Sequence, residues 1–142
     1  MGTKTDAPKL IDDLNRALPL LVRDAVAAAM AAASLPGPQG VSMALRLREI
    51  AADEIRDVEG VAARIVSLGG SPAVAVEALE PPKTWAAGVK WLVRMQRESL
   101  DAFVAAIPAD ADDAEGEASE HLLEHLLARK RDAVEVLERA LR

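Results

Sequence analysis

The sequence predicts an all-α protein built as a four-helix bundle, and three observations carry that prediction. Apolar residues recur at three- and four-residue intervals through four long segments, as in helices that bury one face. Alanine, leucine and valine supply most of the apolar residues, whereas aromatic residues make up only 2% of the chain. This composition favours closely packed helices over sheets. Breaks rich in glycine and proline separate the four segments.

The four predicted helices cover residues 7–34, 39–68, 83–107 and 114–141. The first carries an apolar stripe from Ile11 to Ala28, and the turn signal "LPGPQG" follows it. The second carries its stripe from Leu47 to Leu68 and closes at "LGGSP". The third follows "EPPK" and carries its stripe from Trp85 to Ile107. The fourth follows "IPADADD" and carries its stripe from Leu123 to Leu141. Each segment is long enough to span a bundle.

The connection between the second and third predicted helices is longer than the other two. Its twelve residues, Ser71 to Pro82, reach ~40 Å when extended. A helix of about 28 residues is ~42 Å long, so this segment could cross the whole bundle and make the second and third helices parallel. The alternative is that "AVAVEAL" coils into a short helix. We expect the short first and last connections to join antiparallel neighbours.

Length and composition limit the classes of function. The 142 residues predict a single domain spanning residues 1–142. A formal net charge of -6 argues against nucleic acid as a main partner. Cysteine is absent, which excludes disulfides, thiolate ligands and a cysteine nucleophile. We see neither a signal peptide nor an 18-residue apolar span free of charge, and therefore expect a soluble cytoplasmic protein with no membrane partner.

One layer of the inward stripes is polar, and it lies near the middle of the predicted bundle. The inward positions of this layer are Leu21, Glu54, Asp57, Gln96, Lys130 and Ala133. Unpaired buried charges are costly, so these groups must meet one another, a metal or water. One reading is a partly hydrated polar layer. The other is a metal site, since carboxylates that project from facing helices hold metal pairs in bundles.

The stretch "REIAADEIRDVEGVAARIVSLGGSP", residues 48–72, resembles the second helix of bacterioferritin-like and DNA-protection-like (Dps-like) ferritins. In those proteins a Glu-x-x-His pair precedes a helix end of the form R-I-x-x-L-G-G-x-P. "LNRAL" (Leu14–Leu18) resembles the start of their first core helix, and "QRESLDAF" (Gln96–Phe103) falls where their third helix carries a ligand. The resemblance implies a ferritin-like antiparallel bundle with the long crossover, iron oxidation at a di-iron site, and iron storage in a hollow oligomer.

The di-iron ligands of that family fall mostly on other residue types in this sequence. The helix-one carboxylate falls on Leu21 and the helix-three glutamate on Gln96. The helix-two pair falls on Glu54, which is kept, and on Asp57, where histidine is expected. The Glu-x-x-His pair of helix four falls on Lys130 and Ala133, or on Arg129 and Asp132 if the register shifts by one. The haem-binding methionine falls on Ile55, so haem is not expected. With most ligands replaced, no cofactor is expected, and iron is expected only if the chain is an active ferritin.

Lys130 offers a replacement for the missing metal. An ammonium group has no lone pair to give to a metal, but it donates three hydrogen bonds. We expect it to pair with Glu54 and Asp57 and to donate a further hydrogen bond to the side-chain oxygen of Gln96. Glu54 and Asp57 are also the residues that remain as candidate metal ligands. The six positions are therefore interpreted as the remainder of a di-iron site, with no catalytic residue among them.

Two histidines stand apart from this layer. His121 and His125 are one turn apart in "EHLLEHLLARK", a spacing that can bind a transition metal. The leucines around them set the buried face, so we expect both histidines at the surface or in a subunit contact.

The sequence leaves two functions open. The first is a non-catalytic ferritin-like subunit that forms an oligomer or shell, or assembles with an active ferritin. The second is an active iron-oxidising storage protein whose ligands lie at unfamiliar positions, such as Glu49, Glu54, Asp57, Glu98 and Asp132.

Overall fold

Four α-helices form the described part of the chain: α1 (Ala7–Ser34), α2 (Gly37–Ser67), α3 (Trp85–Ala106) and α4 (Ala114–Ala140). The computed structural model describes residues 2–108 and 110–142, and those residues contain no β-strand. Each helix begins and ends within two residues of its predicted bounds. The prediction of an all-α four-helix bundle is therefore confirmed.

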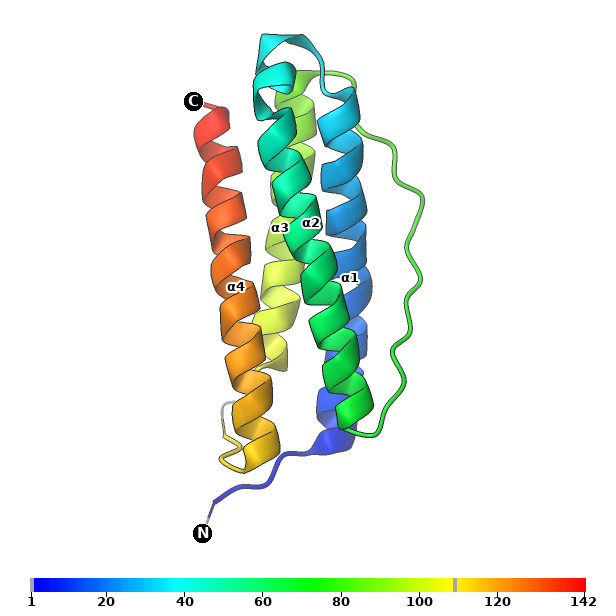
Figure 1. The fold of residues 1–142 in the computed structure, drawn as a ribbon, viewed down its shortest axis with the longest axis vertical. Coiled ribbons are helices and arrows are strands. Elements are labelled where there is room, and N and C mark those ends of the chain that lie inside the picture. Colours follow the sequence, from blue (N-terminus) through cyan, green and yellow to red (C-terminus); the bar gives the residue numbers. More distant parts are fainter. Residues whose placement is uncertain (1, 109) are drawn as a thin grey trace.

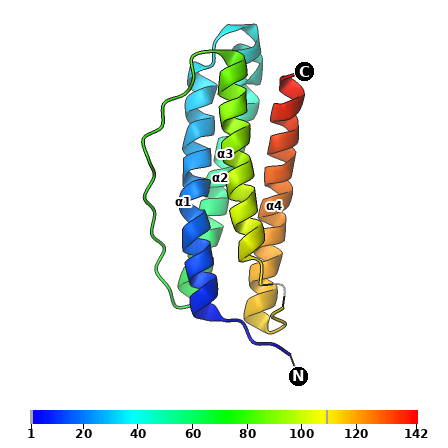
Figure 2. The same ribbon diagram turned by 180° about the vertical axis from the view of Figure 1, so that it is seen from behind.

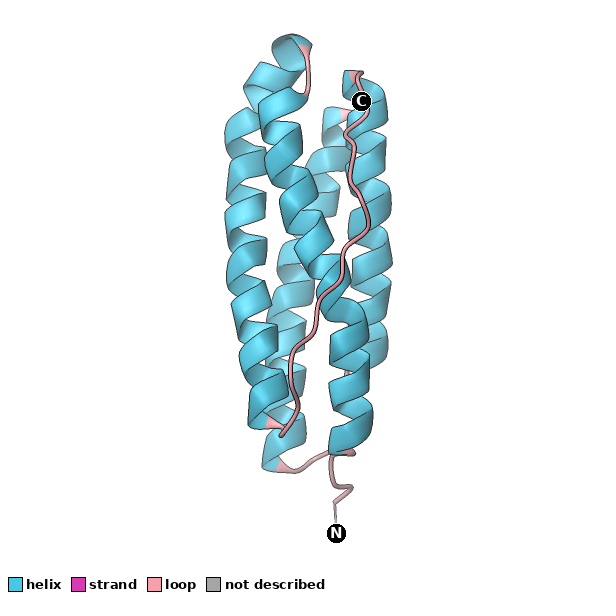
Figure 3. Cartoon of the chain, turned by 90° about the vertical axis from the view of Figure 1, so that its right-hand side faces the viewer, coloured by secondary structure: helices cyan, strands magenta, loops and turns pink. Residues whose placement is uncertain are grey.

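The long connection crosses the full bundle. Figure 1 shows α1 and α2 antiparallel, followed by an extended segment that returns along α1 before α3 begins. Figure 2 shows the same arrangement from behind, with α3 antiparallel to α4. Residues 70–82 contain no helix, and Figure 3 shows them running the length of the bundle. The predicted crossover is confirmed, and the alternative of a short helix there is wrong.

Asn15 attaches the start of the crossover to α1. Its side-chain Nδ2 donates to the Ser71 carbonyl oxygen at 3.0 Å, and its Oδ1 accepts from the Ala73 amide at 3.0 Å. Gly69 lets the chain leave α2, because its φ of 95° lies in the left-handed region that favours glycine. The extended segment is thus fixed where it begins, although most of its side chains are exposed.

Side-chain caps define the start of three of the helices. The carboxylate of Asp6 accepts from the Lys9 amide, the Thr84 hydroxyl from the Ala87 amide, and the Asp113 carboxylate from the Gly116 amide. Each bond satisfies one of the free N–H groups at a helix N-terminus. Asp113 also holds the N-terminal arm, because it accepts hydrogen bonds from both the amide and the hydroxyl of Thr5.

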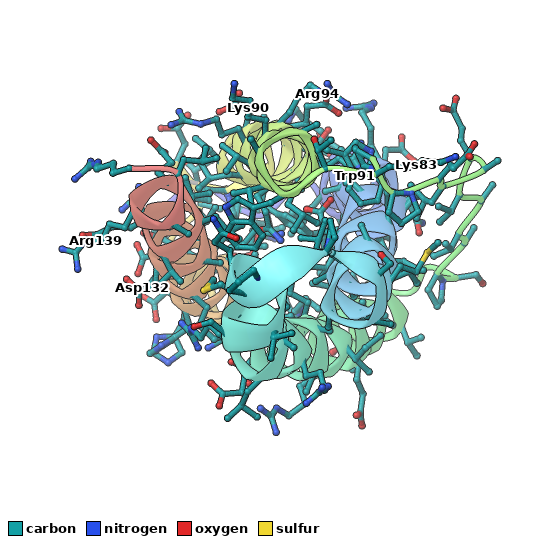
Figure 4. All side chains as sticks on the ribbon, turned by 90° about the horizontal axis from the view of Figure 1, so that it is seen from above. Lys83, Lys90, Trp91, Arg94, Asp132 and Arg139 are labelled. Carbon is teal, nitrogen blue, oxygen red and sulfur yellow. The ribbon has the colours of Figure 1, made fainter. Side chains whose placement is uncertain are left out.

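The core divides into apolar clusters on either side of a polar layer. One cluster surrounds Phe103 and includes Leu14, Leu21 and Ile65, while a second surrounds Leu47, Leu92 and Leu137. Asp24, Glu54, Gln96 and Lys130 are buried between them. Other charged side chains labelled in Figure 4, such as those of Lys90, Arg94 and Arg139, point away from the bundle axis. The polar layer is therefore an internal feature of the bundle.

The helices do not pack equally closely on all sides. α1 packs most extensively against α2, and α3 packs against both α1 and α4, whereas α2 and α4 meet more sparsely. The side between α2 and α4 is consequently the open side of the bundle. It is also the side on which the buried polar layer lies nearest to the surface.

By length and composition alone, α1 passes as a membrane-spanning helix. Its most apolar 18-residue window has a mean hydropathy of 1.4, and half of that window is buried inside the bundle. A helix in the core of a globular protein meets the same criteria. The expected absence of a membrane partner stays a prediction.

Candidate functional site

Each of the four helices contributes a polar side chain to a group that meets at the centre of the bundle. Asp24 comes from α1, Glu54 from α2, Gln96 from α3 and Lys130 from α4. None of these four residues exceeds 4% relative exposure. We call this set the central cluster. Because burial removes these groups from water, each must find its partners inside the protein.

The ammonium group of Lys130 lies at the centre of this cluster. Its Nζ is 3.0 Å from Asp24 Oδ2, 3.1 Å from Glu54 Oε2 and 2.9 Å from Gln96 Oε1. A lysine ammonium has three N–H donors, and three oxygens from three different helices accept them. The hydrogen-bonding capacity of Lys130 is therefore filled.

Further contacts complete the hydrogen bonding of the acceptors. Gln96 donates from Nε2 to Glu54 Oε1, so its amide bridges the lysine and the glutamate. Ser99 donates its hydroxyl proton to Asp24 Oδ2. Arg23 donates from Nε to Asp24 Oδ1 at 3.1 Å, and it also binds the carboxylate of Glu98. Asp24 thus contacts two cations, Lys130 and Arg23, whereas Glu54 contacts Lys130.

Burial shifts the protonation of both carboxyl groups in the cluster. Desolvation raises the pKa of Glu54 to about 7, although the nearby Lys130 ammonium opposes that rise. Desolvation likewise raises the pKa of Asp24, against the opposing effects of Lys130, Ser99 and Arg23. A buried carboxyl group favours its neutral form because ionisation is costly in a medium of low polarity. Glu54 therefore titrates close to neutral pH.

The predicted contact between Lys130 and Asp57 is wrong. Asp57 is buried, but its carboxylate binds Arg129, which donates from Nη2 to Oδ1 and from Nε to Oδ2 at 3.2 Å. Three residues advance a helix by about 4.5 Å and leave the side chain turned by about 60°. That displacement directs Asp57 toward the open side between α2 and α4, where the planar guanidinium of Arg129 matches both carboxylate oxygens.

The remaining predicted positions lie outside the cluster. Leu21 is fully buried in the apolar cluster around Phe103, and Ala133 packs with Ala28, Ile50 and Ala51. His121 and His125 are both exposed, with their rings edge to face at 4.5 Å between centroids. The register of α4 follows the first of the two alternatives, because Lys130 and Ala133 are buried whereas Arg129 and Asp132 are exposed.

A small cavity leads from the surface to the cluster on the side between α2 and α4. Its volume is about 100 Å³. Glu54 and Lys130 lie at its inner end, and its lining also includes Arg46, Asp53, Asp57, Arg129 and Asp132. The cluster is thus buried but lies close to solvent along one path.

Known structures share this arrangement of helices. No protein-family model matches the sequence, and no curated protein has a significantly similar sequence. A ferritin-like diiron-carboxylate protein from Bacillus anthracis str. Ames superposes with a TM-score of 0.87 at 18% identity, covering 99% of this chain and 100% of that one. A bacterioferritin-related dodecameric thioferritin from Bacteroides fragilis gives 0.85 at 19% identity, covering 97% and 87%. A Dps protein from Vibrio cholerae O1 gives 0.67 at 16% identity, covering 96% and 91%.

This is the ferritin-like fold. The resemblance first seen in residues 48–72 therefore extends to the architecture of almost the whole chain.

The residues at the centre of this ferritin-like bundle do not fit a resident di-iron pair. Redox-active iron needs several carboxylate oxygens and imidazoles for each ion. The cluster offers the carboxylates of Asp24 and Glu54 and the weak amide oxygen of Gln96, and the Lys130 ammonium already occupies the space among them. The arrangement is that of an ion-pair network centred on the Lys130 ammonium.

The alternative set of ligands does not converge. Glu49 pairs with Arg46 and Glu98 with Arg23, while Asp57 is held by Arg129. In residues 2–108 and 110–142, no three histidine, aspartate or glutamate side chains gather in a way that could hold a metal ion. Glu49, Glu98 and Asp57 therefore each bind a different arginine.

Sequence reasoning missed two members of the site, Asp24 and Ser99. Asp24 lies next to Ala25 on the predicted stripe and was not assigned to the polar layer. A usable signal was present, because Arg23 and Asp24 are the only charged residues between residues 17 and 34. A charged pair in an otherwise apolar helix must find a polar environment. Ser99 carries no comparable signal, since serine occurs commonly on helix surfaces.

Proposed function

We propose that this chain is a non-catalytic ferritin-like subunit in which the Lys130 ammonium replaces the metal of the bundle centre. One observation supports the proposal above the others: Lys130 Nζ is enclosed at 2.9–3.1 Å by oxygens from α1, α2 and α3. A metal ion entering this space would have to displace a buried cation that already satisfies those oxygens. The expected role is therefore structural rather than oxidative.

The proposal includes assembly with further copies of the chain, or with an active ferritin as an inert subunit. The Bacteroides fragilis protein with the same fold is described as dodecameric. Exposed alanines and apolar residues on the outer helix faces of this chain would allow close packing between subunits. The net charge of -6 supports a protein partner over nucleic acid.

The decisive experiment follows Fe(II) oxidation in air by absorbance, with bound iron then counted per chain. We expect oxidation at the protein-free rate and no retained iron. Fast oxidation with about two irons per chain would overturn the proposal and support the iron-oxidising alternative. A di-iron ferritin assayed in the same buffer serves as the positive control, so that a negative result cannot come from the conditions.

A further inference from the structure

A nucleophile and an electrophile are held in contact at the centre of the bundle. Lys130 Nζ, from α4, lies 2.9 Å from Oε1 of Gln96, from α3. The two residues are only 1% and 2% exposed. An uncharged lysine amine attacks carbonyl carbons, and the side-chain amide of glutamine contains one. Fixing the two groups together removes the entropic cost that makes their reaction negligible in free solution.

Glu54 sets the orientation of the Gln96 amide. Its Oε1 accepts a hydrogen bond from Gln96 Nε2, while its Oε2 lies 3.1 Å from Lys130 Nζ. A flipped amide would place the Gln96 oxygen against a carboxylate and its NH₂ group against an ammonium, which leaves both contacts repulsive. The Gln96 carbonyl is therefore directed at Lys130 and its NH₂ group at Glu54.

The carboxyl group of Glu54 thus contacts both nitrogens that an exchange at this amide would involve. Oε2 is placed to take a proton from the Lys130 ammonium, which frees the lone pair of Nζ. Oε1 is placed to protonate Nε2 of Gln96, as a departing amine requires. Glu54 is 4% exposed, and a buried carboxylate readily accepts a proton because its ionised form is costly there.

Asp24 also contacts Lys130 Nζ, but its carboxyl group is the poorer electrophile. Arg23 and Ser99 donate hydrogen bonds to its two oxygens, and both bonds favour the ionised form against the effect of burial. A carboxylate anion resists attack by a nucleophile, whereas the Gln96 amide is uncharged. Asp24 therefore holds the lysine in place, and Gln96 is the group that it attacks.

We propose that Lys130 and Gln96 react with each other to form an isopeptide bond, a side-chain amide that joins α4 covalently to α3. Lys130 Nζ bonds to Cδ of Gln96, the Cδ–Nε2 bond breaks, and Nε2 leaves as ammonia. Of the three ammonium protons, one stays on the new amide, one stays on Glu54, and one passes through Glu54 to the departing nitrogen. The charges balance, because an ammonium and a carboxylate become a neutral amide and a neutral carboxyl group.

The reaction needs little movement and has an exit for its product. The carbonyl carbon of Gln96 is one C=O bond, ~1.2 Å, from Oε1, so a small rotation of the side chain brings it to Nζ. The cavity between α2 and α4, with a volume of about 100 Å³, reaches Lys130 and Glu54 and lets ammonia leave. Its loss to dilute solution drives the reaction forward. The bond forms after folding, so the hydrogen-bonded cluster is the state that precedes it.

The crosslink does not depend on the proposed function. It requires neither assembly with other subunits nor the absence of iron oxidation, and the iron assay therefore leaves it unaffected. A covalent bond between α3 and α4 would keep the bundle closed, which suits a structural subunit.

Intact mass spectrometry of the natural protein is the first test. Purified protein is kept for a week at neutral pH and its mass is measured at intervals. We expect a growing fraction of chains to be lighter by about 17 Da, the mass of ammonia. An unchanged mass after the week would overturn the crosslink. A loss of about 18 Da, the mass of water, would identify a carboxyl group as the acceptor and overturn the assignment to Gln96.

Digestion with trypsin locates the bond. Cleavage at the flanking arginines leaves residues Met95–Arg97 joined to Lys130–Arg131 in one branched peptide. The unreacted chain releases the two segments separately and is also cut after Lys130, whereas an acylated lysine is not cleaved. A lighter chain without this branched peptide would mean that the bond lies elsewhere, contrary to the proposal.

Glu54→Gln tests the part played by the carboxyl group. The variant keeps the size of the side chain but cannot relay protons, so the branched peptide should form at least about a hundredfold more slowly. Glu49→Gln, an exposed change on the same helix, is the matched control and should react at the natural rate. Circular dichroism verifies that both variants fold. Equal rates in Glu54→Gln and the natural protein would contradict the proposed proton transfer.

Discussion

Lys130 Nζ lies 3.1 Å from Glu54 Oε2 in the middle of the bundle, with neither side chain more than 5% exposed. This pair joins α2 to α4, which pack more sparsely against each other than α1 packs against α2 or α3. Asp24 and Gln96 extend the contact to the other two helices. A single ammonium group therefore ties together all four elements of a ferritin-like bundle.

Replacing Lys130 with alanine is expected to lower the free energy of unfolding by ~3–5 kcal/mol, because Asp24 and Glu54 would be left buried without their shared cation. Urea denaturation at neutral pH measures the change. The matched control is Arg131→Ala at the following residue, whose side chain is exposed. That variant should lose ~0.5 kcal/mol or less. Equal losses in the two variants would show that the central cluster has no special role in stability.

Removal of the Lys130 side chain is also expected to create a metal site. In Lys130→Ala the oxygens of Asp24, Glu54 and Gln96 would face an empty space, and carboxylate and carbonyl oxygens are ligands that suit Mn²⁺. Added Mn²⁺ should therefore raise the Tm of Lys130→Ala, since a ligand that binds only the folded state stabilises it. The natural protein should show no comparable shift. An identical response of both proteins would mean that Lys130 does not keep the cation out.

Glu54 is expected to make stability depend on pH between about 5 and 7. Its pKa rises from 4.5 to about 7 on folding, so the folded state binds more protons than the unfolded state in that range. Stability should consequently fall as pH rises through the range, by up to ~3 kcal/mol. Asp24 contributes with the same sign because burial raises its pKa as well.

Glu54→Gln isolates this effect, because the amide does not titrate. Unfolding free energies of the natural protein and the variant are compared at intervals between pH 5 and 8. The unfolding free energy of the natural protein minus that of Glu54→Gln should decrease as pH rises. Asp113, whose pKa is lowered by its bonds to Thr5, titrates below this range and does not interfere. A constant difference across the range would show that Glu54 keeps an ordinary pKa.

Asn15→Ala is expected to release the crossover rather than to disrupt the bundle. The variant removes the two hydrogen bonds from Asn15 to Ser71 and Ala73. Both bonds are exposed to water, so the loss of stability should be ~1 kcal/mol or less. Limited proteolysis should cut residues 70–82 faster than in the natural protein, because a freed loop is a preferred cleavage site. Asp12→Ala, an exposed change on the same helix, is the control. Unchanged cleavage would mean that other contacts hold the segment.

The helices could be predicted because their signals are local. Three- and four-residue periodicity follows from the geometry of the α-helix, and glycine or proline ends each element for reasons of backbone conformation. The crossover was predictable for a related reason: the twelve residues from Ser71 to Pro82 are too many for a simple turn and enough to span the bundle. Glu54, Gln96 and Lys130 were also placed correctly, since each interrupts an apolar stripe at an inward position.

The sequence by itself determined the four-helix architecture, the register of three cluster residues and the need to neutralise charge within the core. Only the tertiary structure decided which partners meet. Asp24 reaches Lys130 although Leu21 was the expected position on α1, and Asp57 binds Arg129 although it lies only three residues from Glu54. The reason is physical: periodicity fixes which face a residue occupies, whereas a hydrogen bond depends on rotations and shifts between helices of a few ångströms. Those displacements are set by the packing of all four helices together.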